Sequence, residues 1–115
     1  MILILIVSEI IPLMYVILGY IFWHHPPKNI NGSAGWRTKQ SMKSQETWDY
    51  ANTYGGKGLY VMGLIQLGVT LVLDFFALRL KGDILGLYLI VLVIVQASLM
   101  VVIYKQIENE LKVKF

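Results

Sequence analysis

The sequence has no cysteine, few prolines and little charge. Without cysteine the chain can form neither a disulfide nor a thiolate metal site. Charged residues make up 15% of the 115 residues and hydrophobic residues 57%, a balance that a water-soluble chain of this length does not need. The length is that of a single domain. The apolar residues are gathered in three long runs, which is the pattern of membrane-spanning segments.

The three apolar runs are residues 1–23, 59–80 and 84–104. Each has about 20 residues, enough for a helix to cross a hydrocarbon core of about 30 Å. Helices are favoured because they satisfy their own backbone hydrogen bonds in lipid. The second run contains Asp74, but its thirteen Leu, Ile, Val and Phe residues contribute roughly −0.3 to −0.6 kcal/mol each, against roughly +3 kcal/mol for a central Asp. We therefore predict an all-α membrane protein with three transmembrane helices in a single membrane domain, 1–115.

The basic residues predict the orientation of these helices. The loop 24–58 and the tail 105–115 together carry eight Lys or Arg residues, whereas the connection between the second and third runs has Arg79 and Lys81. The positive-inside rule then places the loop and the tail in the cytoplasm and the N-terminus outside. The net charge of +3 suits the anionic inner leaflet of a membrane. The expected partner is the lipid bilayer and not nucleic acid. At the outer turn, Asp83 is a candidate N-cap for the third helix.

Polar and small residues form a stripe on each predicted helix. Polar groups are costly in lipid unless they face protein or water, so the three stripes should face one another. At about 1.5 Å per residue, we predict an outer layer of carboxyl groups and an inner layer of amides. The outer layer holds Glu9 and Asp74, and the inner layer holds Gln66 and Gln96. The stripes are Ser8, Pro12, Tyr15 and Gly19, flanked by Glu9; Gly63, Gln66, Thr70, Asp74 and Ala77; and Gly86, Leu89, Val93, Gln96 and Met100.

Glu9 and Asp74 allow two interpretations. Two like charges close together in a low dielectric cannot both stay ionised cheaply. Such a pair could form the proton or cation site of a small transporter or channel. Alternatively, Glu9 is protonated and hydrogen-bonded across helices while Asp74 reaches outward to Arg79. In that case both acids serve the structure.

The most polar stretch lies between the first two runs and reads GWRTKQSMKSQETWDYAN, residues 35–52. Ser41 and Ser44 are both competent N-caps, and the residues after Ser44 predict a short amphipathic helix with Trp48 inserted at the headgroup level. The glycine-rich segment 55–58 is expected to end that helix. Arg37 either pins the loop to the inner end of the helix bundle or contacts a ligand or partner, and Thr38 is expected to cap a turn.

This loop resembles the SdpI family of bacterial membrane proteins. The resemblance covers about residues 26–66, and its specific part is the spacing from Gly-aromatic-Arg-Thr to Trp between two spans. Trp36 stands where Tyr or Ile is expected, and the family's namesake has more spans than this chain. The residues that carry the resemblance are Pro27, Asn29 or Asn31, Gly35, Trp36, Arg37, Thr38, Ser41, Met42, Ser44, Trp48, Ala51 and Asn52.

The resemblance implies a role in immunity or signalling. The namesake gives immunity to a secreted membrane-active peptide and, when the toxin is present, holds a transcriptional repressor at the membrane. By this resemblance, the chain is expected to neutralise a peptide toxin or to sequester a cytoplasmic regulator through the loop from Arg37 to Trp48. Two further expectations are a role as an accessory subunit of a larger complex and a homodimer formed through the glycine-bearing faces.

Neither an enzyme nor a cofactor site is expected. The sequence shows no pairing of a nucleophile with a base, and the glycine-rich segment 55–58 is too short and misplaced for a phosphate-binding loop. His24 and His25 lack the further residues that would complete a zinc site. With Pro26 and Pro27 following them, these two histidines are interpreted as interfacial anchors, and no metal is expected.

Overall fold

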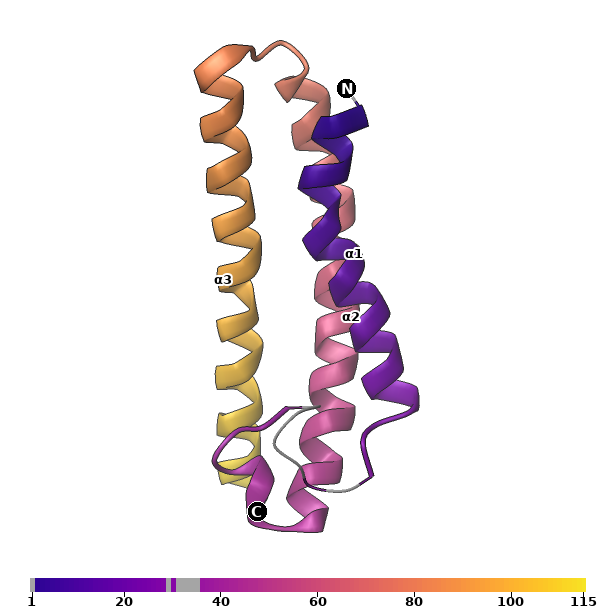
Figure 1. The fold of residues 1–115 in the computed structure, drawn as a ribbon. Coiled ribbons are helices and arrows are strands. Elements are labelled where there is room, and N and C mark those ends of the chain that lie inside the picture. The colour runs from indigo at the N-terminus through magenta and orange to yellow at the C-terminus, as the bar shows by residue number, and fades with distance from the viewer. Residues whose placement is uncertain (1, 29, 31–35) are drawn as a thin grey trace.

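The computed structural model of the chain describes residues 2–28, 30 and 36–115. These residues form three long α-helices and one short 3₁₀-helix: α1 (Ile2–His24), η1 (Ser41–Lys43), α2 (Gln45–Ala77) and α3 (Gly82–Lys114). The helices α2 and α3 run antiparallel, and α1 crosses α2 obliquely (Figure 1). All three long helices are long and apolar enough to cross a membrane. The prediction of an all-helical chain with three such helices is confirmed.

Two of the helices continue well beyond the predicted spans. Both α2 and α3 have 33 residues, which corresponds to about 50 Å of helix at 1.5 Å per residue. This agrees with the longest dimension of the molecule, 51 Å. A hydrocarbon core of about 30 Å therefore leaves roughly 20 Å of these helices outside it. The tail 105–115 is almost entirely helical.

The prediction of a separate amphipathic helix is wrong. Its residues are the first turns of α2, which runs without interruption through the glycine-rich segment 55–58. The predicted N-cap is correct: the Ser44 hydroxyl accepts from the backbone N–H of Thr47, and the Thr47 hydroxyl accepts from the backbone N–H of Ser44. This reciprocal pair satisfies two of the N–H groups that a helix start leaves open.

The turn between α2 and α3 also differs in detail from the prediction. Lys81, and not Asp83, is the N-cap residue of α3, and Asp83 lies in the first helical turn. Gly82 has a φ of 61°, a left-handed conformation that glycine adopts without steric cost. The helix α3 therefore begins two residues earlier than an Asp83 cap would require.

The first two helices touch backbone to backbone at glycines. A Cβ atom on Gly56 would lie 2.5 Å from the backbone nitrogen of Trp23, and one on Gly63 would lie 2.8 Å from that of Val16. A Cβ on Gly19 would collide with the backbone of Tyr60. Small residues of this kind allow close helix packing in membranes. The predicted inner stripe of α1 is buried, as its contact with α2 requires: Ser8, Pro12, Tyr15 and Gly19.

These intrachain contacts bear on the expected homodimer. Gly19, Gly56 and Gly63 are covered by the chain's own helices. In contrast, Gly68 and Gly86 have open space where a side chain would be. A homodimer stays a prediction, but the glycines at the α1–α2 contact are not its interface.

The third helix packs mainly through its C-terminal half. Within α3 the buried residues are Gln96, Ile103, Ile107 and Leu111, whereas Met100 of the predicted stripe is 37% exposed. Ile103, Ile107 and Leu111 pack with residues of the loop and of α2 in the main apolar cluster. That cluster comprises Tyr15, Trp36, Ala51, Leu59, Ile103, Ile107 and Leu111, so the core lies toward the loop end of the bundle.

The glycine contact makes a stability prediction. Gly56→Ala should lower the stability of the folded chain by about 1–3 kcal/mol, because the added methyl group meets backbone atoms of α1 that cannot move separately. Gly68→Ala is the matched control in the same helix, with no heavy atom near the added group. It should be neutral or stabilising, since alanine is the better helix former. Thermal unfolding in detergent micelles measures both, and equal behaviour of the two variants would contradict the close contact.

Candidate functional site

Residues 36–44 form a cap over the loop ends of α2 and α3, here termed the loop cap (Figure 1). Burial alternates along its first residues. Trp36 is 7% exposed and Thr38 is fully buried, whereas Arg37 between them is exposed. The loop cap therefore directs two motif side chains inward and holds the guanidinium-bearing side chain on its surface.

Asn52 fastens the loop cap to α2. Its Oδ1 accepts a 2.7 Å hydrogen bond from the backbone N–H of Trp36, and its Nδ2 donates a 2.9 Å hydrogen bond to the backbone oxygen of Trp48. Asn52 is fully buried, so both interactions are shielded from water. Gly55, one helical turn on, has no side chain, which lets the Trp36 indole lie against the helix.

Hydroxyl groups close the turn within the loop cap. The Ser41 hydroxyl accepts from the backbone N–H of Thr38 at 2.8 Å and lies 2.8 Å from the carbonyl oxygen of Trp36. The Thr38 hydroxyl accepts from the backbone N–H of Ser41 at 3.1 Å. The Thr47 hydroxyl lies 3.0 Å from the carbonyl oxygen of Ser41. The prediction that Thr38 caps a turn is confirmed.

Trp48 is completely buried and not inserted among lipid headgroups. Its indole N–H donates a 2.8 Å hydrogen bond to the carbonyl oxygen of Pro27, in the segment that leaves α1. Nearby, the Gln45 amide donates to the carbonyl oxygen of Lys28 at 2.6 Å. These two bonds join the end of α1 to the start of α2. An aromatic side chain with an N–H is suited to this position, because it packs its ring and still satisfies a backbone carbonyl.

Two glutamates of α3 complete the attachment of the loop end. The Glu108 carboxylate accepts a 3.1 Å hydrogen bond from the backbone N–H of Gln40, and the Glu110 carboxylate accepts one of 3.1 Å from the hydroxyl of Tyr50. The ammonium of Lys114 lies 4.6 Å from the centroid of the Tyr50 ring. Burial, with the hydrogen bond to Glu110, raises the pKa of the Tyr50 hydroxyl. This phenol therefore stays protonated and donating at neutral pH.

Two of the predicted motif residues, Asn29 and Gly35, lie outside the described residues. The described motif residues Trp36, Thr38, Ser41, Ser44, Trp48 and Asn52 are brought together in or beside the loop cap. The C-terminal part of α3 was missed as a partner of the motif. The spacing of Ile103, Ile107 and Leu111 at every fourth residue is a helical stripe that would have indicated it.

A second polar cluster lies between the three helices, toward the end of the bundle opposite the loop cap. The Asp74 carboxylate accepts hydrogen bonds from the Ser8 hydroxyl at 2.5 Å and from the Tyr88 hydroxyl at 2.7 Å. Asp74 thus bridges α1 and α3, which replaces the predicted contact with Arg79. Tyr88 was not among the predicted site residues. The sequence could have indicated that Tyr88 lies opposite Asp74. Both residues are equally far from Lys81 in the turn, so they lie at the same level of two antiparallel helices.

Gln96 extends this cluster toward the middle of the bundle. Its side-chain amide donates to the backbone oxygen of Ser8 at 2.9 Å and lies 3.0 Å from the Thr70 hydroxyl. The Tyr15 hydroxyl donates to the backbone oxygen of Gln96 at 3.0 Å. Ser8 therefore bonds both the carboxyl group of Asp74 and the amide of Gln96, so the two predicted polar layers are joined into one network through all three helices.

Glu9 does not take part in this network through hydrogen bonds. Both of its carboxylate oxygens are buried and have no hydrogen-bond partner within the described part of the chain. The predicted hydrogen bond from Glu9 across the helices is therefore wrong. Among the same residues, no three His, Asp or Glu side chains lie where they could hold a metal ion.

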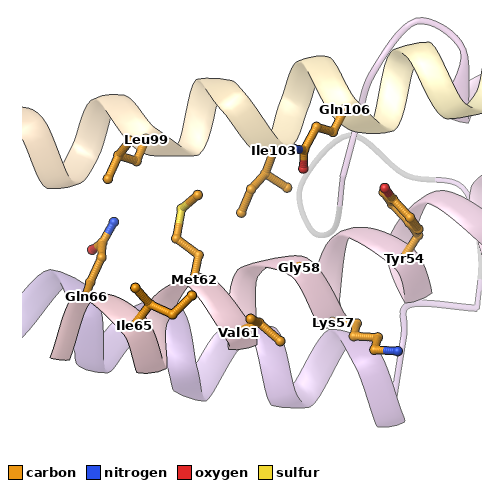
Figure 2. A pocket seen from close by; sticks show the side chains of 10 residues that line it. All are labelled: Tyr54, Lys57, Gly58, Val61, Met62, Ile65, Gln66, Leu99, Ile103 and Gln106. Carbon is orange, nitrogen blue, oxygen red and sulfur yellow. The ribbon is translucent and has the colours of Figure 1, made fainter. Parts of the chain in front are cut away.

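A lateral groove of about 540 Å³ separates α2 from α3 on the loop side of Gln96. Its walls are largely apolar, with Met62 and Ile65 from α2 opposite Leu99 and Ile103 from α3 (Figure 2). Tyr54, Lys57 and Gln106 lie at its loop end, and Gln66 lies at its other end. The volume is in the range of pockets that bind organic ligands. This groove is termed the α2–α3 groove below.

The Asn52 contacts predict how the loop cap is stabilised. Asn52→Ala should cost about 1–3 kcal/mol, because the buried N–H of Trp36 loses its acceptor. Thr53→Ala, at an exposed position of the same helix, should change stability by less than about 0.5 kcal/mol. Tryptophan fluorescence during thermal unfolding measures both, since Trp36 and Trp48 become exposed when the loop cap opens. An Asn52→Ala chain as stable as the Thr53→Ala chain would show that this anchor is dispensable.

The intramembrane network makes a separate prediction. Tyr88→Phe should destabilise the chain by roughly 0.5–2 kcal/mol, the range for hydrogen bonds between helices in membranes, because Asp74 loses one donor. Tyr104→Phe is the matched control at a position that is 43% exposed, and it should be neutral. Denaturation in mixed micelles compares them. Equal stabilities would mean that the Asp74–Tyr88 bond contributes nothing net.

Comparison with known proteins gives two matches. The model of the SdpI/YfhL protein family matches residues 28–104. "Uncharacterized protein YfhL" from Bacillus subtilis (strain 168) is 36% identical over 69 residues, which are 58% of this chain and 63% of that protein. The chain thus matches somewhat less than two thirds of this relative's length. No solved structure is significantly similar to the chain.

The matched segment is wider than the loop. It starts at Lys28, before the loop cap, and ends at Tyr104 within α3. It therefore takes in the loop cap, all of α2 and the apolar part of α3, including Asp74, Tyr88 and Gln96. Since this is more than half of the chain, the multi-pass membrane protein described here belongs to the SdpI/YfhL protein family.

Proposed function

We propose that this protein is an immunity or signalling protein of the bacterial cell membrane. It neutralises a membrane-active peptide, or it holds a cytoplasmic regulator at the loop cap, and it does so without enzymatic chemistry. The observation that carries this proposal is the loop cap itself. The side chains of the motif residues are buried and hold the backbone of the loop cap in place, and Arg37 is exposed on its surface. A loop fixed by so many buried hydrogen bonds is suited to recognition, because little order remains to be imposed on binding.

The contacts of the loop cap with α2 and α3 support a signalling role in particular. Asn52 of α2 accepts a hydrogen bond from the backbone of Trp36, and Glu108 of α3 accepts one from the backbone of Gln40. A change in the packing of these two helices would therefore alter the loop cap directly. Coupling of this kind needs a physical connection that both sites can bias, and these two bonds supply one.

In the proposed orientation the loop cap faces the cytoplasm and the N-terminus lies outside. The basic residues of the loop and of the C-terminal part of α3 favour this arrangement by the positive-inside rule. Arg37, an exposed residue, then lies on the cytoplasmic side, and a guanidinium there suits a carboxylate of a protein partner or a lipid phosphate.

A proton- or cation-coupled transporter is less well supported. Both oxygens of Asp74 are hydrogen-bonded to hydroxyl groups, which gives this residue a structural role in joining helices. Glu9 has no such hydrogen-bond partner in the described residues. The geometry therefore favours helix association over ion movement as the role of the polar network.

A deletion strain tests the proposed function. Loss of the gene should raise sensitivity to membrane-active peptides, and the wild-type chain should restore resistance. Arg37→Ala should bind its partner about tenfold or more weakly, the loss expected for a charge-assisted hydrogen bond. It should restore protection or repressor retention poorly, although the chain folds normally. Lys39→Ala, an exposed cation in the same loop cap, is the control and should complement fully.

The outcomes of this test are distinct. Unchanged peptide sensitivity and unchanged repressor distribution after deletion would refute the proposal as a whole. Full complementation by Arg37→Ala would leave immunity standing and remove Arg37 from it. Measuring peptide survival and the membrane fraction of the repressor separately distinguishes immunity from signalling.

A further inference from the structure

The α2–α3 groove crosses the predicted membrane surface. The side chains that line it within the predicted spans 59–80 and 84–104 are apolar, apart from Gln66 at its far end. The lining side chains outside those spans supply a hydroxyl, an ammonium and an amide, from Tyr54, Lys57 and Gln106. All three are exposed and lie at the loop end of the groove (Figure 2). The groove therefore leads from the level of the lipid headgroups into the hydrocarbon of the leaflet on the loop-cap side.

The length of the groove matches that leaflet. Lys57 and Gln66, which line its two ends, are nine residues apart on α2, which is about 14 Å at 1.5 Å per residue. Half of a hydrocarbon core of about 30 Å is about 15 Å. A helical peptide that crosses the membrane would extend well beyond the groove, and a helix with its side chains is at least about 10 Å wide. An acyl chain of one leaflet is both shorter and thinner.

The loop end of the molecule carries an excess of positive charge. Residues 24–58 and 105–115 include eight Lys or Arg and four Asp or Glu residues, a difference of +4. The ammonium of Lys57 lies 5.8 Å from the centroid of the Trp23 ring, where the first predicted span ends. It is therefore held at the membrane surface, and its flexible four-carbon stem allows it to turn toward an anion at the loop end of the groove.

We propose that the α2–α3 groove binds one anionic phospholipid, with an acyl chain between α2 and α3 and the phosphate beside Lys57. The hydroxyl of Tyr54 and the amide of Gln106, on the two walls at the same end (Figure 2), are donors that phosphate oxygens accept. A lysine near the membrane surface attracts anionic headgroups. This inference goes beyond the proposed function and does not depend on it.

A second copy of the chain suits the groove less well than an anionic lipid. Copies inserted in the same direction place their cationic loop ends side by side, and like charges repel. A phospholipid instead brings a negative charge to the cationic end and an apolar chain to the apolar walls. Association between copies is an outcome that the experiment below detects.

Native mass spectrometry of the full chain in detergent micelles tests the site, because it counts bound lipids and copies of the chain. The probes are phosphatidylglycerol and phosphatidylcholine with the same acyl chains. One phosphatidylglycerol should bind about fivefold more tightly than phosphatidylcholine, the effect of one lysine near an anionic headgroup. Glycerophosphoglycerol, the same headgroup without acyl chains, should not bind, which distinguishes a lipid site from a site for a free anion.

Charge variants test the headgroup end of the site. Lys57→Gln should bind phosphatidylglycerol about fivefold more weakly than wild type, and its preference over phosphatidylcholine should largely disappear. Lys105→Gln is the matched control. It removes an exposed cation at the same end of the molecule, from a residue that does not line the groove, and it should bind like wild type.

Filling variants test the acyl-chain end. A Cβ on Gly58 would lie 3.9 Å from a methyl carbon of Ile103 across the groove, so Gly58→Leu should fill the space and lose both lipids. Gly68→Leu, where nothing lies near the added side chain, should bind like wild type. Val61→Trp is a second filling variant should Gly58→Leu fold poorly. Circular dichroism confirms that each variant is helical.

Several results would overturn the lipid inference. Equal binding of the two lipids by the wild-type chain, or equal losses in Lys57→Gln and Lys105→Gln, would exclude a headgroup site at Lys57. Lipid binding that survives both Gly58→Leu and Val61→Trp would place the lipid elsewhere. A dimer mass that disappears in Gly58→Leu would assign the groove to self-association. An added leucine–alanine helix that displaces the lipid and is itself lost in Gly58→Leu would assign the groove to a helical peptide.

Discussion

The backbone contact between α1 and α2 is the interaction on which the rest of the structure depends. At Gly19, Gly56 and Gly63 the two helices approach too closely for any side chain to fit between them. Bundle helices in lipid gain little from apolar burial, since lipid tails are as apolar as leucine. Their association needs close packing and hydrogen bonds. This contact supplies the packing, and it fixes Ser8 at one end of the crossing and Pro27 at the other, where each completes a hydrogen bond to another part of the chain.

Much of this arrangement could be predicted from the sequence, because the bilayer imposes strong constraints. The three helices followed from apolar run length, and the buried stripes of α1 and α2 followed from the cost of exposing polar groups to lipid. Ser44 as the N-cap of α2 followed from the need to satisfy the first N–H groups of a helix. Each of these inferences uses one local rule that tertiary context seldom reverses in a membrane.

The failures share a different cause. Glycines were interpreted as helix breakers at 55–58, yet α2 continues through them, because at Gly55 and Gly56 the absent side chains make room for the Trp36 ring and for α1. Trp48 was assigned to the headgroups, yet it is buried. Depth alone placed the carboxyl and amide groups in two layers and did not show that Gln96 and Asp74 both bond Ser8. In each case the local preference of a residue predicted one environment, but the residue contacts another part of the chain. A single sequence does not show which distant residues are in contact.

The distribution of satisfied polar groups separates what holds the fold from what is available for binding. Most motif side chains in the loop cap point inward and are fully used: Thr38, Ser41, Trp48 and Asn52. Folding alone therefore accounts for these side chains, and they say little about the ligand. Recognition has to use groups that the fold directs outward. Arg37 is exposed on the loop cap, between the buried Trp36 and Thr38 that fix the backbone there, so its place on the surface is set by the same contacts that hold the fold.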